Sequence, residues 1–110
     1  MQLKILITGK VQGVGFRPFI YRIAIQNQIT GWVQNQSGEV LVLAEGSEQH
    51  LQEFQQAILS QHPPLAKPMI SDVTEAKAGN KFHKFEIKKS EKKFGSLKYF
   101  SYISIVIEWG

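Results

Sequence analysis

Apolar residues recur along this chain with two different spacings, and each spacing predicts a different kind of element. Residues 2–8 are apolar at every second position, which is typical of a strand with one buried face. Residues 17–28 carry apolar side chains three and four positions apart, and this spacing indicates an amphipathic helix. We therefore expect the chain to begin with a strand followed by a helix.

Turn and capping residues define the elements that follow. Residues 31–35 and 39–45 predict two strands, and the Gln-Ser-Gly sequence between them predicts a hairpin turn. Ser47 is a candidate N-cap for a second amphipathic helix, which a His-Pro-Pro sequence ends. Residues 68–78 and 82–87 complete the set as two further strands.

This order of elements predicts the fold class. Strand, helix, strand, strand, helix and strand, with one more strand after them, indicate an α+β fold. We expect a ferredoxin-like βαββαβ sandwich, with an antiparallel sheet and two helices on one face. Residues 1–88 would form this domain, and residues 89–110 would be a basic linker and a tail. Alternating apolar positions within residues 97–109 are compatible with an extra edge strand.

The charge of the chain is concentrated in one segment. The formal net charge is +4 over 110 residues, and residues 77–98 hold eight lysines against two glutamates. We interpret this segment as a solvated strand edge and tail rather than as a nucleic-acid surface. The absence of cysteine excludes disulfides, thiolate catalysis and cysteine zinc sites. Neither a secretory leader nor an apolar run of membrane-spanning length is evident, so we expect a cytoplasmic protein.

A glycine-rich loop is predicted between the first strand and the first helix. Glycines at positions 9, 13 and 15 allow backbone N–H groups to turn inward, and such a nest binds anions. The helix N-terminus adds a partial positive charge, and Arg17 offers a planar fork that matches a phosphoryl group. From these residues alone, a phosphate-binding loop and a purely structural turn are both open. The fingerprints of dinucleotide-binding and P-loop proteins are missing.

Two short sequences carry a resemblance to a known family. Residues 11–17, Val-Gln-Gly-Val-Gly-Phe-Arg, resemble the signature loop of the acylphosphatase family. Residues 31–35, Gly-Trp-Val-Gln-Asn, resemble its second signature, which ends on the catalytic asparagine. The resemblance covers about residues 2–88. It implies the ferredoxin-like fold that the apolar pattern predicts independently.

Two further stretches narrow the resemblance. Residues 17–22 and 63–66 are similar to the N-terminal acylphosphatase-like domain of the hydrogenase-maturation carbamoyltransferase. Cysteine-rich zinc modules follow that domain in the larger enzyme, whereas this chain has no cysteine. We therefore expect a stand-alone domain or a remnant of the larger protein. One departure lies near the expected site, because Glu39 stands where the family usually has a glycine, and the nearest glycine is Gly38.

The resemblance implies a reaction that needs neither a metal ion nor a cofactor. The substrate would be an acyl phosphate, or carbamoyl phosphate, and water would cleave it to a carboxylate and inorganic phosphate. Of the two catalytic residues, Arg17 would bind the phosphoryl group and Asn35 would position the attacking water. The phosphate-binding loop would consist of Gln12, Gly13, Val14, Gly15, Phe16 and Arg17.

Two other functions are open at this point. The loop could bind phosphate or carbamoyl phosphate without turnover, as a non-catalytic domain. The same order of elements also serves RNA-binding domains, but these need paired aromatic side chains on the central strands. Residues 2–8 and 39–45 have no aromatic residue. We expect a monomer that binds a small acyl phosphate or carbamoyl phosphate, and neither nucleic acid nor a membrane.

Overall fold

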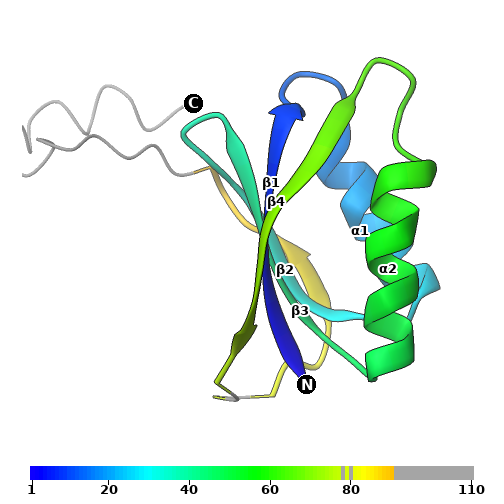
Figure 1. Cartoon of the computed structure of the whole chain (residues 1–110). Coiled ribbons are helices and arrows are strands. Elements are labelled where there is room, and N and C mark those ends of the chain that lie inside the picture. Colours follow the sequence, from blue (N-terminus) through cyan, green and yellow to red (C-terminus); the bar gives the residue numbers. More distant parts are fainter. Residues whose placement is uncertain (78, 80, 91–110) are drawn as a thin grey trace, which may run out of the picture.

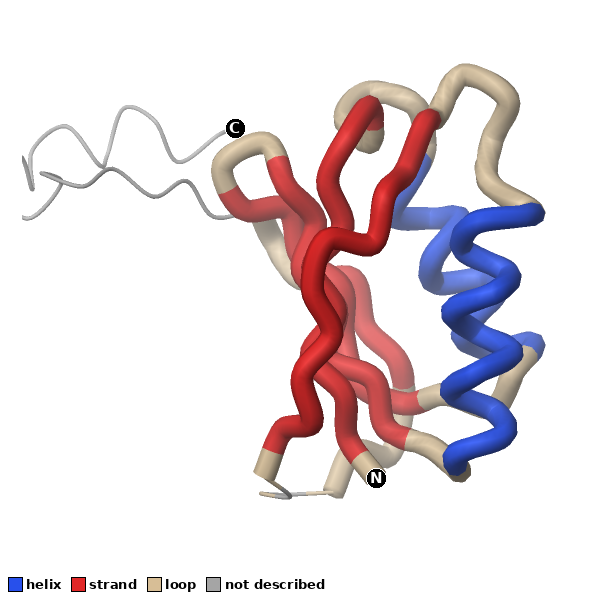
Figure 2. Tube along the Cα trace, viewed as in Figure 1, coloured by secondary structure: helices blue, strands red, loops and turns tan. Residues whose placement is uncertain are grey.

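The computed structural model describes residues 1–77, 79 and 81–90, which form one sheet with two helices packed on it (Figure 1). The elements are β1 (Gln2–Lys10), α1 (Phe16–Gln26), β2 (Thr30–Gln36), β3 (Glu39–Glu45), α2 (Glu48–Ser60), β4 (Lys67–Ala76) and β5 (Phe85–Ile87). Figure 2 shows both helices on the same side of the sheet. The α+β, ferredoxin-like fold is therefore confirmed. The extra strand expected within residues 97–109 lies outside the described residues.

The sheet is mixed, which corrects the expectation of a wholly antiparallel sheet. Its order is β4-β1-β3-β2-β5, and β5 pairs with β2 in parallel, whereas the other neighbours pair antiparallel. The last residue of β4, Ala76, lies opposite Gln2 at the start of β1. The chain enters β5 from this same end of the sheet, because the carbonyl oxygen of Lys84, just before β5, accepts a hydrogen bond from the backbone N–H of Gly31 at the start of β2. As a result, β5 runs in the same direction as β1 and β2.

The hairpin between β2 and β3 accommodates the unusual position of its glycine. Gln36 pairs with Glu39, so only Ser37 and Gly38 form the loop. Both have positive φ, 50° and 85°, which is the geometry of a type I′ turn. Glu39 is already part of β3 and needs no special backbone angle. The hairpin therefore forms a regular two-residue turn without a glycine at position 39.

The core lies between the sheet and the two helices. Alternate residues of β1, β2 and β3 face it, and the helices contribute residues at helical spacing. Its largest fully buried side chains include Phe16, Phe19, Ile20 and Ile23 of α1, Leu51, Phe54 and Ile58 of α2, and Ile5, Ile7, Val33 and Val40 of the sheet. A one-residue slip of any strand would turn its apolar face to water. This packing fixes the positions of the strand ends and of the first turn of α1.

Glu45, at the end of β3, ties the segment before β5 to the sheet. Its Oε1 atom accepts hydrogen bonds from the backbone N–H of Phe82, at 3.0 Å, and from Nε2 of Gln2, at 3.4 Å. The hydrogen bond from Phe82 lowers the pKa of Glu45, and Gln2 and the charge of Lys81 lower it further. The ionised carboxylate is therefore the form that stabilises the fold.

This lowered pKa predicts a specific loss of stability in acid. The stabilisation is complete above the pKa of an unfolded glutamate, about 4.3, and is lost as pH falls through the lower folded-state pKa. We expect Glu45→Gln to be less stable than the wild type at pH 7, with the difference shrinking as pH approaches 3. Urea denaturation across this range measures it, with exposed Glu75→Gln as control. A difference that does not change with pH would contradict the assignment.

Candidate active site

The loop between β1 and α1 depends on two glycines for its shape. The φ angle is 69° at Gly13 and 72° at Gly15, values that other residues rarely adopt. A Cβ atom at either position would meet no described atom within 4 Å, so the glycines are required for their backbone angles rather than for space. The loop thus has the left-handed residues from which anion-binding nests are built, and it lies open to solvent.

The N-terminus of α1 follows this loop without a side-chain cap. Gly15 is the N-cap residue, and no side chain of the described chain hydrogen-bonds there. In α2, by contrast, Ser47 Oγ accepts a hydrogen bond from the backbone N–H of His50 at 3.1 Å, which confirms its predicted capping role. Pro18, in the first turn of α1, has no N–H group. The free N–H groups that remain at this end, and the helix dipole, favour a negatively charged ligand.

The structure brings the two signature sequences into contact. Nε2 of Gln12, in the loop, donates a hydrogen bond to Oδ1 of Asn35, near the end of β2, at 3.2 Å. β1 and β2 both run antiparallel to β3, so the loop after β1 and the end of β2 lie at the same end of the sheet. Asn35 is two positions after the buried Val33, which places it on the face that the helices cover. The asparagine therefore lies beside the loop.

Arg17 is the second residue of α1, and its side chain is half-buried. Its Nη1 atom donates a hydrogen bond to Oγ of Ser90 at 3.2 Å. Among the described residues, no carboxylate lies within 4.0 Å of the Arg17 guanidinium. The arginine is therefore held in place by a neutral group, and no carboxylate in the described part of the chain neutralises its positive charge.

Lysines add to the positive charge at this end of the sheet. Lys10, at the end of β1, pairs in register with Lys67, at the start of β4. Lys88 and Lys89 follow the end of β5, which runs to the same end of the sheet. Among the described residues, Glu39, at the start of β3, supplies the negative charge at this end. The excess of positive charge favours the approach of anionic substrates.

Ser90 and Lys89 lie at the site although no sequence motif predicted them there. Lys89 contributes its backbone oxygen, which accepts a hydrogen bond from Nε2 of Gln34 at 3.0 Å. Ser90 thus contacts the predicted catalytic residue Arg17 itself, and Lys89 contacts Gln34, which directly precedes Asn35. Neither of them belongs to a motif, and no local pattern marks such contacts between distant segments.

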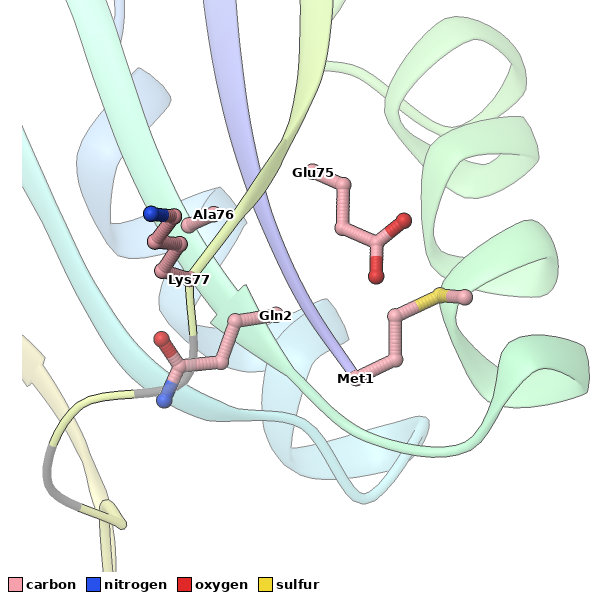
Figure 3. A pocket seen from close by; sticks show the side chains of 5 residues that line it. All are labelled: Met1, Gln2, Glu75, Ala76 and Lys77. Carbon is pink, nitrogen blue, oxygen red and sulfur yellow. The ribbon is translucent and has the colours of Figure 1, made fainter.

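A pocket at the opposite end of the sheet contains none of the predicted site residues. It is lined by Met1, Gln2, Glu75, Ala76 and Lys77, at the start of β1 and the end of β4 (Figure 3). The side chains of Glu75 and Lys77 point apart in this view. The pocket shares no residue with the loop, with α1 or with the end of β2.

Two kinds of feature are absent from the described residues. No group of three or more histidine, aspartate or glutamate side chains there could hold a metal ion. No helix in the same part of the chain is long and apolar enough to cross a membrane.

Known proteins resemble this chain over most of its length. The family model described as Acylphosphatase matches residues 3–87, a range that includes both signature sequences. The acylphosphatase of Bacillus subtilis is 40% identical over 88 residues, which cover 79% of this chain and 96% of that protein. A probable carbamoyltransferase HypF of Methanocaldococcus jannaschii is 41% identical over 91 residues, but the match spans only 12% of that protein.

Solved structures give the same two kinds of relative. The crystal structure of acylphosphatase from Bacillus subtilis superposes with a TM-score of 0.71 at 40% identity, covering 79% of this chain and 97% of that one. Full-length HypF in its phosphate- and nucleotide-bound form superposes with a TM-score of 0.79 at 33% identity, covering 86% of this chain and 12% of that one. The chain therefore matches nearly the whole of one kind of relative and a small part of the other.

Proposed function

Because the chain belongs to the acylphosphatase family, we propose that it hydrolyses acyl phosphates to a carboxylate and inorganic phosphate. The observation that carries this proposal is the hydrogen bond between Gln12 and Asn35. It joins the predicted phosphate-binding loop to the residue expected to position water. A site that only binds phosphate has no need for a water-positioning group at this place.

The first step in this proposal is binding of the phosphoryl group. Backbone N–H groups from Gln12 to Arg17 would donate hydrogen bonds to its oxygens, at the uncapped start of α1. The Arg17 guanidinium would contact the same group with charge-assisted hydrogen bonds. None of the described carboxylates pairs with Arg17, which supports this role, because an arginine without such a partner keeps its charge for the substrate.

The second step is attack by water. Asn35 Oδ1 has two lone pairs, of which one accepts from Gln12, so the other can accept a hydrogen atom of the attacking water. Water held in this way has its own lone pair directed toward phosphorus. The new oxygen–phosphorus bond forms as the bond to the carboxylate oxygen breaks, and the carboxylate leaves with the electron pair. An amide is too weak a base to take the proton of the water, so the proton passes to a phosphoryl oxygen of the substrate.

The proposal also covers the oligomeric state of the enzyme, its compartment and its ligands. We propose a monomeric enzyme, in which one copy of the chain supplies Gln12, Arg17 and Asn35. We place it in the cytoplasm, and expect it to bind neither nucleic acid nor membranes. Carbamoyl phosphate is a second candidate substrate, because it is also a mixed anhydride and because the chain resembles part of HypF. The activity of the larger carbamoyltransferase is not part of this proposal.

Purified protein should hydrolyse benzoyl phosphate without added metal. Positioning and electrostatic stabilisation suffice for a carboxylate leaving group, so a chelator should leave the steady-state rate unchanged. The measurement is the rate with and without chelator, and again after adding a divalent ion. Activity that disappears with chelator and returns with the ion would contradict the mechanism.

The same assay separates the enzyme from a non-catalytic phosphate-binding domain. A binding domain would bind inorganic phosphate in an equilibrium experiment but would leave benzoyl phosphate intact. An enzyme would hydrolyse the substrate, with inorganic phosphate as a competitive inhibitor. Comparing benzoyl phosphate with carbamoyl phosphate in the same assay then ranks the two substrate classes.

A further inference from the structure

We propose that Ser90 is a positioning residue for Arg17, which holds the guanidinium ready for the phosphoryl group. The Nη1 atom of Arg17 donates to Oγ of Ser90 at 3.2 Å, although the two residues are 73 positions apart in the sequence. Both side chains are half-buried. The inference deepens the proposed function, and it rests on that function for the role of Arg17.

Ser90 can position another group because the chain directly before it is anchored to β2. The backbone N–H of Lys88 donates to the carbonyl oxygen of Val33 at 2.8 Å, which continues the parallel pairing of β5 with β2. Nζ of Lys88 lies 4.5 Å from the centre of the Trp32 ring, within the range of a cation–π contact. Gln34 then binds the backbone oxygen of Lys89. Three contacts to β2 thus fix the two residues directly before Ser90.

A hydroxyl group suits this task better than a carboxylate. An arginine side chain is long, and ordering it at the moment of binding reduces affinity. A hydrogen bond to Ser90 orders the side chain of Arg17 beforehand. Because the hydroxyl is neutral, it does not compete with the phosphoryl group for the charge of Arg17, as an acidic partner would.

The first test compares conservative and disruptive variants of Ser90 in the full chain. Ser90→Ala should weaken binding of inorganic phosphate about three- to tenfold, as expected for the loss of one hydrogen bond of ordinary net strength. Ser90→Thr keeps the hydroxyl and should restore binding. Ser71→Ala is the matched control, because Ser71 lies on β4 at the opposite edge of the sheet and its hydroxyl is also hydrogen-bonded, to Thr8. Calorimetry measures phosphate binding without turnover.

The second test uses charge. Ser90→Asp should form an ion pair with Arg17 and weaken phosphate binding about 30-fold or more, and raising the salt concentration should reduce this defect relative to the wild type. Ser90→Asn, which is similar in size but neutral, should bind far better than Ser90→Asp. A serine with only a structural role would give similar losses for the two variants, and that result would overturn the proposal.

A third measurement does not depend on catalysis or on phosphate. The NMR order parameter of the Arg17 Nε–Hε group should fall in Ser90→Ala and recover in Ser90→Thr. Unchanged Arg17 order in Ser90→Ala would overturn the role of Ser90, even if the wild type hydrolyses benzoyl phosphate. Loss of order together with weaker phosphate binding, in a protein that shows no hydrolysis, would support Ser90 and contradict the proposed enzymatic function.

Discussion

Replacing Arg17 with alanine should abolish most phosphate binding and most hydrolysis together. In the proposed mechanism the guanidinium touches the phosphoryl group both before and during the reaction, so its loss affects affinity and rate alike. Removal of one donor to a developing charge costs about 10²–10³ in rate, and Arg17 also supplies a full charge. We therefore expect kcat/KM to fall by about 10³-fold or more, with KM and the inhibition constant of phosphate both raised.

Two further variants distinguish the contact of Arg17 with phosphate from the general effect of removing an arginine from α1. Arg22→Ala is the matched control, because Arg22 lies on the exposed side of α1 and packs over the ring of Phe19 at 5.7 Å. This variant should keep full activity. Arg17→Lys retains a charge but loses the planar fork, and should recover only part of the binding. Full phosphate affinity in Arg17→Ala, measured on protein with an unchanged melting curve, would contradict the assignment.

Most of the fold was predictable because its signals are local. The alternation in residues 2–8 reflects which side of β1 faces the core, and Ser47 caps α2 because its side chain reaches a backbone N–H three residues ahead. Whether β5 pairs in parallel or antiparallel with its neighbour was not predictable in this way. It depends on which edge of the sheet the chain reaches after β4, and no local sequence pattern encodes that edge. The parallel pairing of β5 is therefore a property of the whole topology.

In the candidate site, too, the features with a local sequence signal were predictable and those that depend on the topology were not. The loop and the end of β2 each carry a continuous sequence that points to phosphate chemistry, so their residues could be proposed before the structure was known. The contact between Gln12 and Asn35 requires β1 and β2 to finish at the same end of the sheet. The strand order determines this, and neither signature sequence does. Ser90 lies beyond the last strand and in no motif, and its contact with Arg17 depends on the pairing of β5 with β2.

Replacing Asn35 with alanine should lower kcat by about 10²–10³ while leaving the affinity for inorganic phosphate nearly unchanged. The amide is assigned to the water rather than to the phosphoryl group, so its loss affects the reaction more than the binding. Gln12→Ala should give a smaller loss in kcat, because it frees the Asn35 amide to rotate without removing it. This order of effects separates Asn35 from Arg17, whose loss should impair both quantities.

The experiment needs a control for the loss of stability that removal of a half-buried asparagine causes in itself. Asn27→Ala serves this purpose, because Asn27 is also half-buried and its Nδ2 atom donates to the Ile23 carbonyl oxygen at the far end of α1. That variant should lose some stability and no activity per folded molecule. For Asn35→Ala we expect the reverse, a nearly unchanged melting curve with a large loss in kcat. If Asn35→Ala kept full turnover, the attacking water would be positioned by another group, and the role assigned to Asn35 would be wrong.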